Sequence, residues 1–250
     1  MYVQKKELWI PCPGGDLYGV LFLPGKGGKL PAVILSHGLY SSCEATALSA
    51  QVLAEAGYAA ICFDYHGCSY TNKSGGDMFH CSPLTEKDEL SAVLDYARSL
   101  DCVDTKKIYL LGQSMGSIVA TLVGSARQAD IAGMILMYFP AHAIEVIRQM
   151  FPSEESIPDA VESFLGIPSL TVGKQFFVDA LQIDIPKAAS QYPGPVYLIT
   201  GDQDELIPVE TAKNSCSLFQ QATLEIVEGG EHGFQLSSEQ ALRIMNALEQ

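Results

Sequence analysis

The sequence predicts an α/β fold with a mostly parallel sheet that is covered by helices on both faces. The main observation is an alternation of short apolar runs with amphipathic helical segments along most of the chain. Strands separated by helices usually run parallel in one sheet, and the helices then cover both of its faces. The second observation is size, because 250 residues, 48% of them hydrophobic, suit one large buried core. We therefore expect a single domain over residues 1–250.

The expected elements follow one another in a regular order. Two strand-like runs at 2–10 and 17–23 flank a Gly-Gly-Asp turn, which is typical of a hairpin. Further strands are expected at 32–36, 59–63, 107–111, 131–137, 196–200 and 223–227. Apolar residues at helical spacing predict helices over 44–56, 83–98, 115–127 and 209–218, and a last helix from about residue 238.

The alternation breaks between residues 140 and 192. This stretch contains several prolines and two short helical fragments, 143–150 and 174–180, and it has no clear strand. It follows a strand whose end should lie beside the expected site. We interpret it as a small helical insertion, a lid, over one edge of that site.

Charge and cysteine usage exclude several classes of protein. The formal net charge is −14 without any basic block, whereas nucleic acids and anionic membranes attract clustered lysine and arginine. Seven scattered cysteines, an odd number, indicate reduced thiols rather than a disulfide framework. The first residues contain no apolar signal-peptide core, and the longest strongly apolar stretch, 131–139, is too short to span a bilayer. We expect a soluble, cytoplasmic protein.

A serine between two glycines is the first candidate for chemistry. The motif GQSMG at 112–116 lies where the strand expected at 107–111 gives way to a helix. The glycines let neighbouring backbone come close, so that Ser114 projects into open space at a helix start, whose N–H groups stabilise negative charge. The alternative is an ordinary tight turn in which Ser114 only caps the helix.

Two later loops supply the partners that a serine nucleophile needs. A hydroxyl reacts when a base takes its proton, and that base needs an acid to orient it. VYLITGDQDELIP places three acids in the loop after a strand: Asp202, Asp204 and Glu205. IVEGGEHGF places His232 in the loop after the next strand, although an ordinary surface histidine is the alternative. All these loops follow the carboxyl ends of parallel strands, where open α/β sheets carry their sites.

In these motifs, and in their order along nearly the whole chain, the sequence resembles the serine hydrolases of the α/β-hydrolase family. The resemblance implies a mostly parallel eight-stranded sheet with a lid insertion. It also implies a nucleophile at Ser114 and a catalytic histidine at His232. The family carries its acid in the pattern G-x-x-D, which corresponds to Asp204 and leaves Asp202 as a loop residue.

Two further segments extend the resemblance. SHGLYSS, residues 36–42, resembles the family's oxyanion loop, which implies that the backbone N–H groups of Leu39 and Met115 form the oxyanion hole. FDYHGCS, from Phe63, resembles the loop F-D-x-x-G-x-G-x-S but lacks one glycine position, so no direct role is carried over. Within the family the chain is most similar to bacterial cinnamoyl and feruloyl esterases, which share the hairpin, the HG loop and an insertion of this size.

Three residues are candidates for the substrate pocket. His142 follows the strand at 131–137 and lies near the lid, although a hydrogen-bonded structural histidine is an equal alternative. Phe176 and Phe177 belong to the lid. With Phe151, Phe164 and Tyr192 they offer an aromatic roof, or these aromatic residues only pack the lid onto the body.

The sequence predicts neither a metal nor an organic cofactor. A zinc set could be drawn from His66, Cys68, His80 and Cys81. Its spacing matches no structural zinc site, and the chain has no glycine-rich nucleotide-binding motif.

Together these features predict a serine esterase that hydrolyses short acyl or hydroxycinnamoyl esters through an acyl-enzyme. Its expected partner is a small-molecule ester, without nucleic acid or membrane, and the oligomeric state is left open. A peptidase, thioesterase or monoacylglycerol lipase with the same triad is the alternative within the enzymes. A non-catalytic binding protein on the same fold is the alternative from another class, but such proteins commonly lose a triad member.

Overall fold

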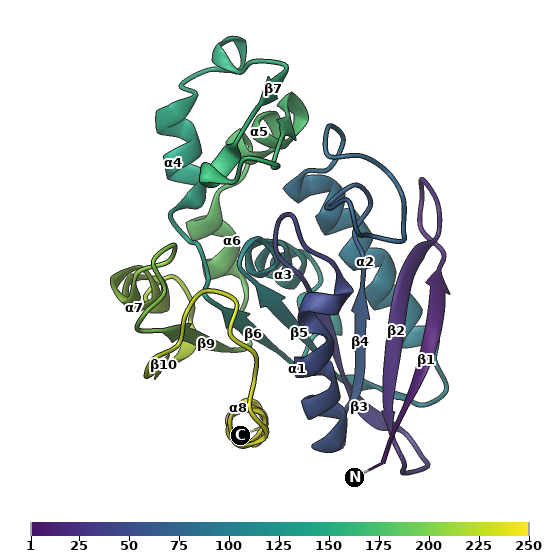
Figure 1. Ribbon diagram of the computed structural model, residues 1–250. Helices are drawn as coiled ribbons and strands as arrows, with labels where there is room; N and C mark the ends of the chain where they lie inside the picture. The colour runs from purple at the N-terminus through teal and green to yellow at the C-terminus, as the bar shows by residue number, and fades with distance from the viewer. Residues whose placement is uncertain (1, 250) are drawn as a thin grey trace.

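A sheet of eight strands forms the centre of the structure (Figure 1). The computed structural model describes residues 2–249, and the strand order in the sheet is β1-β2-β4-β3-β5-β6-β9-β10. The strands are β1 Val3–Ile10, β2 Leu17–Pro24, β3 Leu30–Ser36, β4 Ala59–Phe63, β5 Val103–Gln113, β6 Gly133–Met137, β9 Pro195–Gly201 and β10 Gln221–Val227. The last six strands in the sheet order run parallel, and β2 is antiparallel to both β1 and β4. This confirms the predicted mostly parallel, eight-stranded α/β sheet.

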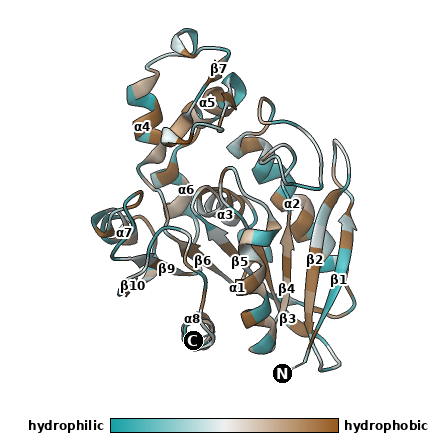
Figure 2. Ribbon diagram, in the orientation of Figure 1, coloured by the Kyte–Doolittle hydropathy of each residue, from teal (hydrophilic) through white to brown (hydrophobic). Residues whose placement is uncertain are grey.

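Helices cover both faces of this sheet. Helices α1 (Cys43–Glu55) and α8 (Ser238–Leu248) lie on one face, and α2 (Pro83–Ser99), α3 (Met115–Ala126) and α6 (Ile185–Gln191) lie on the other (Figure 1). Helix α7 (Val209–Cys216) packs beside β9 and β10. The central strands are buried on both faces and read as continuous apolar runs, as parallel strands do. The edge strand β1 is exposed, and Figure 2 shows it as mostly hydrophilic.

The predicted strands all occur, with some ends displaced. Strand β5 begins at Val103 instead of residue 107, because its pairing with β3 resumes across a register shift, with Val103 opposite Leu30. The expected hairpin at 2–10 and 17–23 forms, and its register places Ile10 opposite Leu17. Within the described residues, no helix is long and apolar enough to cross a bilayer.

The segment between β6 and β9 forms the layer above the carboxyl ends of the strands (Figure 1). It contains α4 (Ala143–Met150), the two-residue strands β7 (Ala160–Val161) and β8 (Val172–Gly173), and α5 (Lys174–Leu181). This segment was expected to contain no strand. That expectation was wrong, because β7 and β8 form a short antiparallel pair. The predicted boundary at 192 also needs correction, because α6 packs against α3 on the body of the protein. Below, "lid" means residues 140–184.

Three contacts tie the lid to the body. The Tyr40 hydroxyl, in the loop after β3, donates a 2.9 Å hydrogen bond to Ser169. The Gly173 N–H donates to the Met78 carbonyl at 3.3 Å. The Ser82 hydroxyl, at the N-terminus of α2, donates to the buried Asp179 carboxylate. The lid therefore contacts the loop after β3 and the long segment before α2.

Candidate functional site

Ser114 stands at the junction of β5 and α3 with a strained backbone. Its φ is 51° and its ψ is −121°, a combination that non-glycine residues rarely adopt. The neighbouring chain holds this conformation, because the Ser114 N–H donates to the Met137 carbonyl at 3.0 Å. The Ser117 hydroxyl, one turn into α3, bonds the Gly112 carbonyl at 2.7 Å and the Met137 carbonyl at 3.1 Å. The turn is therefore fastened to both β5 and β6.

The two glycines of GQSMG are required by backbone crowding. A Cβ on Gly112 would collide with the backbone of Gly116 and Ser117. A Cβ on Gly116 would collide with the carbonyl oxygens of Ser36 and His37 at the end of β3. This is the crowding that the motif predicts. The Ser114 side chain makes no capping hydrogen bond to α3, so it is free of the capping role that was the alternative.

His232 and Asp204 form a hydrogen-bonded pair between neighbouring loops. His232 Nδ1 lies 2.8 Å from Asp204 Oδ2, and the Asp204 side chain is fully buried, whereas a quarter of the His232 side chain is exposed. Asp204 Oδ1 accepts the N–H groups of Leu206 at 2.9 Å and Ile207 at 2.8 Å. These donors fix the carboxylate, which can only accept, so Nδ1 carries the proton and Nε2 is left with a lone pair.

Asp202 makes a different contact from the same loop. Its Oδ1 accepts the Gly229 N–H at 2.7 Å, and its own N–H donates to the Val227 carbonyl at 3.1 Å. Asp202 thus braces the loop that carries His232 without bonding the imidazole. Glu205, the third acid of this loop, is exposed to solvent.

The loop after β3 lies directly against Ser114. A Cβ on Gly38 would approach Ser114 Cβ and the Gln113 carbonyl to 3.2 Å, so only glycine fits here without displacement. Within residues 2–249 the Leu39 N–H donates no hydrogen bond to a protein acceptor. Met115 lies in the first turn of α3, where backbone N–H groups have no partner within the helix.

Leu39, Ser114, Met115 and His232 meet at one cavity of about 160 Å³ under the lid. It is lined by Leu39, Ser114, Met115, Pro140, His142, Ala143, Val146, Ile147, Met150, Phe164, Leu165, Leu206, Ile207 and His232. Its only polar side chains come from Ser114, His142 and His232, and no Lys, Arg, Asp or Glu of the described chain lines it. Within residues 2–249, no hydrogen bond joins Ser114 to His232. Such contacts often tighten only when substrate binds.

Comparisons with known proteins agree with this architecture. Residues 29–161 match the family model described as serine aminopeptidase, S33, a family of hydrolases. This match spans more than half of the chain. The protein belongs to this family. It is an α/β hydrolase.

Two relatives show how far the likeness extends. An uncharacterized 31.7 kDa protein of Escherichia coli is 23% identical over 243 residues, covering 80% of this chain and 82% of its own. Among solved structures, Est1E of Butyrivibrio proteoclasticus with bound ferulic acid superposes with a TM-score of 0.86 at 23% identity. That comparison covers 97% of this chain and all of Est1E. At such identity the likeness concerns the hydrolase fold.

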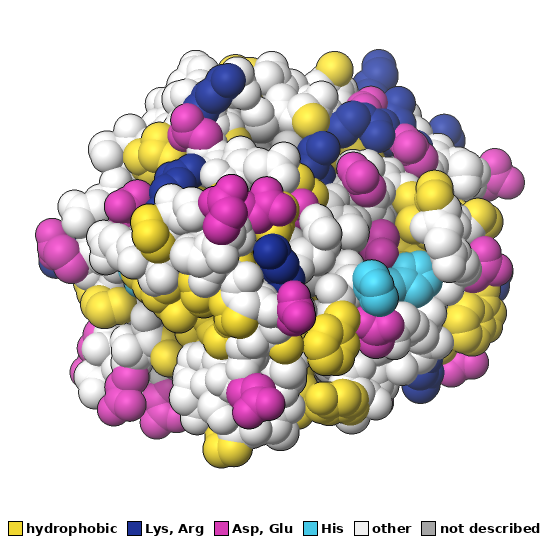
Figure 3. Space-filling view, turned by 90° about the horizontal axis from the view of Figure 1, so that it is seen from above, with side chains coloured by type: hydrophobic (Ala, Val, Ile, Leu, Met, Phe, Trp, Pro, Cys, Tyr) yellow, Lys and Arg dark blue, Asp and Glu magenta, His cyan; other side chains and the backbone are white. Residues whose placement is uncertain are grey.

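Of the five aromatic residues predicted to roof the pocket, Phe164 lines the cavity and the other four do not. His142 lines the cavity as expected, but Phe176 and Phe177 are completely buried and do not reach it. Phe177 packs edge-on against Phe151, Phe164 and Phe176, with ring centroids 5.1 to 5.3 Å apart. Hydrophobic side chains gather on the face seen in Figure 3, and the cavity walls are mostly aliphatic, with Phe164 their single aromatic residue.

Tyr138 packs against His232, a contact that was not predicted from the sequence. Its ring lies 4.7 Å from the His232 ring between centroids, and its backbone has a φ of 40°. The Tyr138 N–H donates to the Ile199 carbonyl at 2.7 Å, which fixes the strained residue beneath His232. Burial raises the pKa of Tyr138, so its phenol stays neutral beside the imidazole. No sequence signal marks a tyrosine for positive φ.

The zinc set drawn from the sequence does not assemble. His66 bonds Glu89 at 2.9 Å, and the exposed His80 bonds Asp77 at 2.8 Å. Cys68 and Cys81 come together without either histidine, beside Glu86.

We predict that Phe177→Ala lowers the free energy of unfolding by about 3–5 kcal/mol, because it removes a fully buried ring from the lid core. Urea denaturation measures the change. Met150→Ala is the matched control in the same lid, since Met150 lines the cavity but is 47% exposed. It should cost about 0.5 kcal/mol or less. Equal losses for the two variants would contradict this division of the lid into core and cavity wall.

Proposed function

We propose that this hydrolase cleaves neutral carboxylic esters through an acyl-enzyme formed on Ser114. One observation carries the proposal: Ser114 and His232 line the same cavity. Ser114 lies on a strained turn, and His232 is hydrogen-bonded to the buried Asp204. A binding protein on this fold would have no need for a strained serine beside an oriented histidine.

In the first half of the reaction, Ser114 Oγ attacks the ester carbonyl carbon while His232 Nε2 takes the hydroxyl proton. The carbonyl oxygen becomes an anion, which the N–H groups of Leu39 and Met115 and the positive end of α3 would stabilise. The bond to the alcohol oxygen then breaks, and His232 returns its proton to the leaving alcohol. This leaves an acyl group on Ser114.

In the second half, water attacks the acyl carbon and His232 Nε2 takes its proton. A second tetrahedral anion forms at the same place and collapses, so that the carboxylic acid leaves and Ser114 recovers its proton. Asp204 stays ionised throughout. Its role is to hold the Nδ1–H tautomer and to stabilise the imidazolium that forms twice in the cycle.

The cavity lining favours an ester over the aminopeptidase substrate that the family description suggests. An aminopeptidase must hold a substrate ammonium group, for which a carboxylate is the usual partner. No Asp or Glu of the described chain lines the cavity. Its aliphatic walls instead suit an uncharged acyl group. Est1E binds ferulic acid in its structure, so a hydroxycinnamoyl ester is the second acyl class to test.

We expect Ser114→Ala to lower kcat/KM for a p-nitrophenyl ester by at least about 10³-fold, because only binding and oxyanion stabilisation remain. The variant should also lose labelling by a fluorophosphonate probe, which reacts with an activated serine. Circular dichroism checks that it is folded. A folded Ser114→Ala protein with ordinary turnover would end the assignment of the nucleophile.

Asp204→Asn should be far more damaging than Asp202→Asn, although both residues lie in one loop. An amide at 204 no longer selects the Nδ1–H tautomer of His232, which should cost about 10⁴-fold in kcat. An amide at 202 keeps an oxygen that can accept the Gly229 N–H, so a loss below about tenfold is expected. Steady-state kinetics on both variants decide the matter. A larger loss for Asp202→Asn would show that the wrong acid has been assigned.

A substrate panel tests the acyl class. We expect p-nitrophenyl acetate and butyrate to give the highest kcat/KM, methyl ferulate to be turned over less efficiently, and long-chain esters to be poor, because the cavity is small and aliphatic. An aminoacyl p-nitroanilide should not be cleaved. A preference for methyl ferulate would establish the hydroxycinnamoyl class, and efficient cleavage of the anilide would establish a peptidase.

Val146 and Ile226 form a matched pair for testing the cavity wall. Both side chains are 43% exposed, but Val146 lines the cavity, whereas Ile226 on β10 lies outside it and serves as the control. Val146→Ala should change the butyrate-to-acetate ratio of kcat/KM by up to about tenfold, because it alters the wall by two methyl groups. Ile226→Ala should leave the ratio unchanged. An equal shift in both variants would mean that this cavity does not hold the acyl group.

A further inference from the structure

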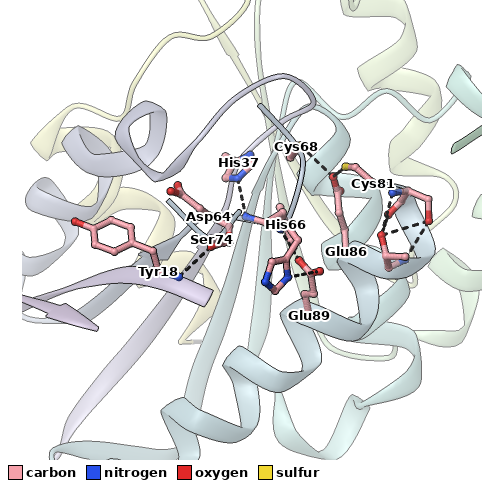
Figure 4. A network of polar contacts seen from close by, with 12 residues as sticks. Tyr18, His37, Asp64, His66, Cys68, Ser74, Cys81, Glu86 and Glu89 are labelled. Carbon is pink, nitrogen blue, oxygen red and sulfur yellow. Dashed lines mark hydrogen bonds and ion pairs between the residues drawn. The ribbon is translucent and has the colours of Figure 1, made fainter. Parts of the chain in front are cut away.

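A buried cluster of two thiols and one carboxylate lies outside the proposed reaction. Cys68, Cys81 and Glu86 are each at most 2% exposed. Both sulfur atoms approach the same carboxylate oxygen, with Cys68 Sγ 3.2 Å and Cys81 Sγ 3.3 Å from Glu86 Oε1 (Figure 4). The three potential ligand atoms all lie within 4.8 Å of one another.

The burial of Glu86 is only weakly compensated within the described chain. Fully buried glutamates are almost always paired, and leaving a buried polar atom without a partner costs free energy. Glu86 forms no ion pair with Lys or Arg of residues 2–249. Its Oε2 is buried and has no hydrogen-bond partner there, and thiols are only weak donors to Oε1. Such a group calls for an ion or a water molecule that completes it.

We propose that Cys68, Cys81 and Glu86 form a zinc site. Two thiolates and a carboxylate suit Zn²⁺, whereas Mg²⁺ and Ca²⁺ require oxygen ligands. With zinc–sulfur bonds of about 2.3 Å and zinc–oxygen bonds of about 2.1 Å, a tetrahedral site has sulfur–oxygen edges of about 3.6 Å. The observed 3.2 and 3.3 Å need to open by only a few tenths of an ångström. The unpartnered Glu86 Oε2 can also bind the ion, in which case the carboxylate is bidentate and the site departs from a regular tetrahedron.

The position of the cluster gives the ion a structural role. Residues 64–82, between β4 and α2, form a connection of 19 residues without helix or strand, and connections of that length are uncommon unless something fastens them. Cys68 lies near its start and Cys81 near its end, and Glu86 lies in the first turn of α2. One ion would therefore close this segment onto the helix.

The segment also supports the loop after β3. Cys68 Sγ lies 3.8 Å from the carbonyl oxygen of Gly38, the residue before Leu39. Tyr65 belongs to the same connection, and its N–H donates to His37 Nε2 at 3.2 Å. The proposed site departs from the sequence-based expectation of no metal, and none of its three ligands lines the cavity in which the ester would bind.

The test uses the full chain without a histidine tag, stripped of metal under reducing conditions. Equilibrium dialysis against Zn²⁺ should give one ion per chain, and the ion should raise the Tm. Substitution with Co²⁺ should give the intense near-ultraviolet charge-transfer band of a cobalt thiolate. Cys68→Ser and Cys81→Ser should each abolish that band, and Glu86→Gln should weaken zinc binding by at least about tenfold. The matched control is Cys43→Ser with Cys62→Ser, two buried thiols outside the cluster, which should retain the site.

Several results would overturn the proposal. Zinc that binds equally well to Cys68→Ser and Cys81→Ser would belong to surface histidines or carboxylates. A Cys68–Cys81 disulfide in the protein as purified, detected by mass spectrometry, would mean that the cluster is a redox pair. If the serine variants do not fold, the cobalt spectrum of the unmodified chain still decides, because absence of a thiolate band excludes the site.

Discussion

The site depends on one close approach of backbone to backbone, between the end of β3 and the turn from β5 into α3. Gly116 lies against the carbonyl groups of Ser36 and His37, and no side chain fits between them. Because of this contact, the first turn of α3 and the loop after β3 border the same cavity. Hydrogen bonds from Ser114 and Ser117 to the Met137 carbonyl hold Ser114 in its strained conformation beside this contact. The acid and the histidine then only need to arrive from strands further along the sheet, which the parallel topology ensures.

This dependence explains why the sequence revealed so much of the fold and of the candidate site. A turn that has no room for a Cβ requires glycine, so the motif GQSMG can be recognised from the sequence alone. Parallel strands must be apolar on both faces, so β4 and β6 were recognisable as continuous apolar runs. Asp204 could be distinguished from Asp202 only through the family pattern. The structure supplies the physical difference, since one carboxylate bonds an imidazole and the other a backbone N–H.

The parts that the sequence did not reveal are those set by tertiary contacts alone. Phe176 and Phe177 were assigned to the cavity because their helix belongs to the lid, but the face that a short helix buries depends on its neighbours. Helix α6 was not predicted because seven residues are too few to show a helical periodicity of apolar residues. Its packing against α3 is a tertiary contact. Tyr138 takes a backbone conformation that its residue type disfavours, because the Ile199 carbonyl and the packing around it determine that conformation. Glu86 resembles any helix-start glutamate in the sequence, and only folding buries it between two thiols.

The charge distribution bears on the direction of the proposed reaction. A neutral ester enters an uncharged, largely aliphatic cavity, but at neutral pH the acid that leaves becomes a carboxylate. Such walls cannot solvate an anion, and burying one without partners is costly. The whole protein carries a formal charge of −14, so its field also repels an anion that has formed in the cavity. The features that admit a neutral ester therefore also favour departure of its product, and an ester with a negatively charged acyl group would be disfavoured both by desolvation and by repulsion.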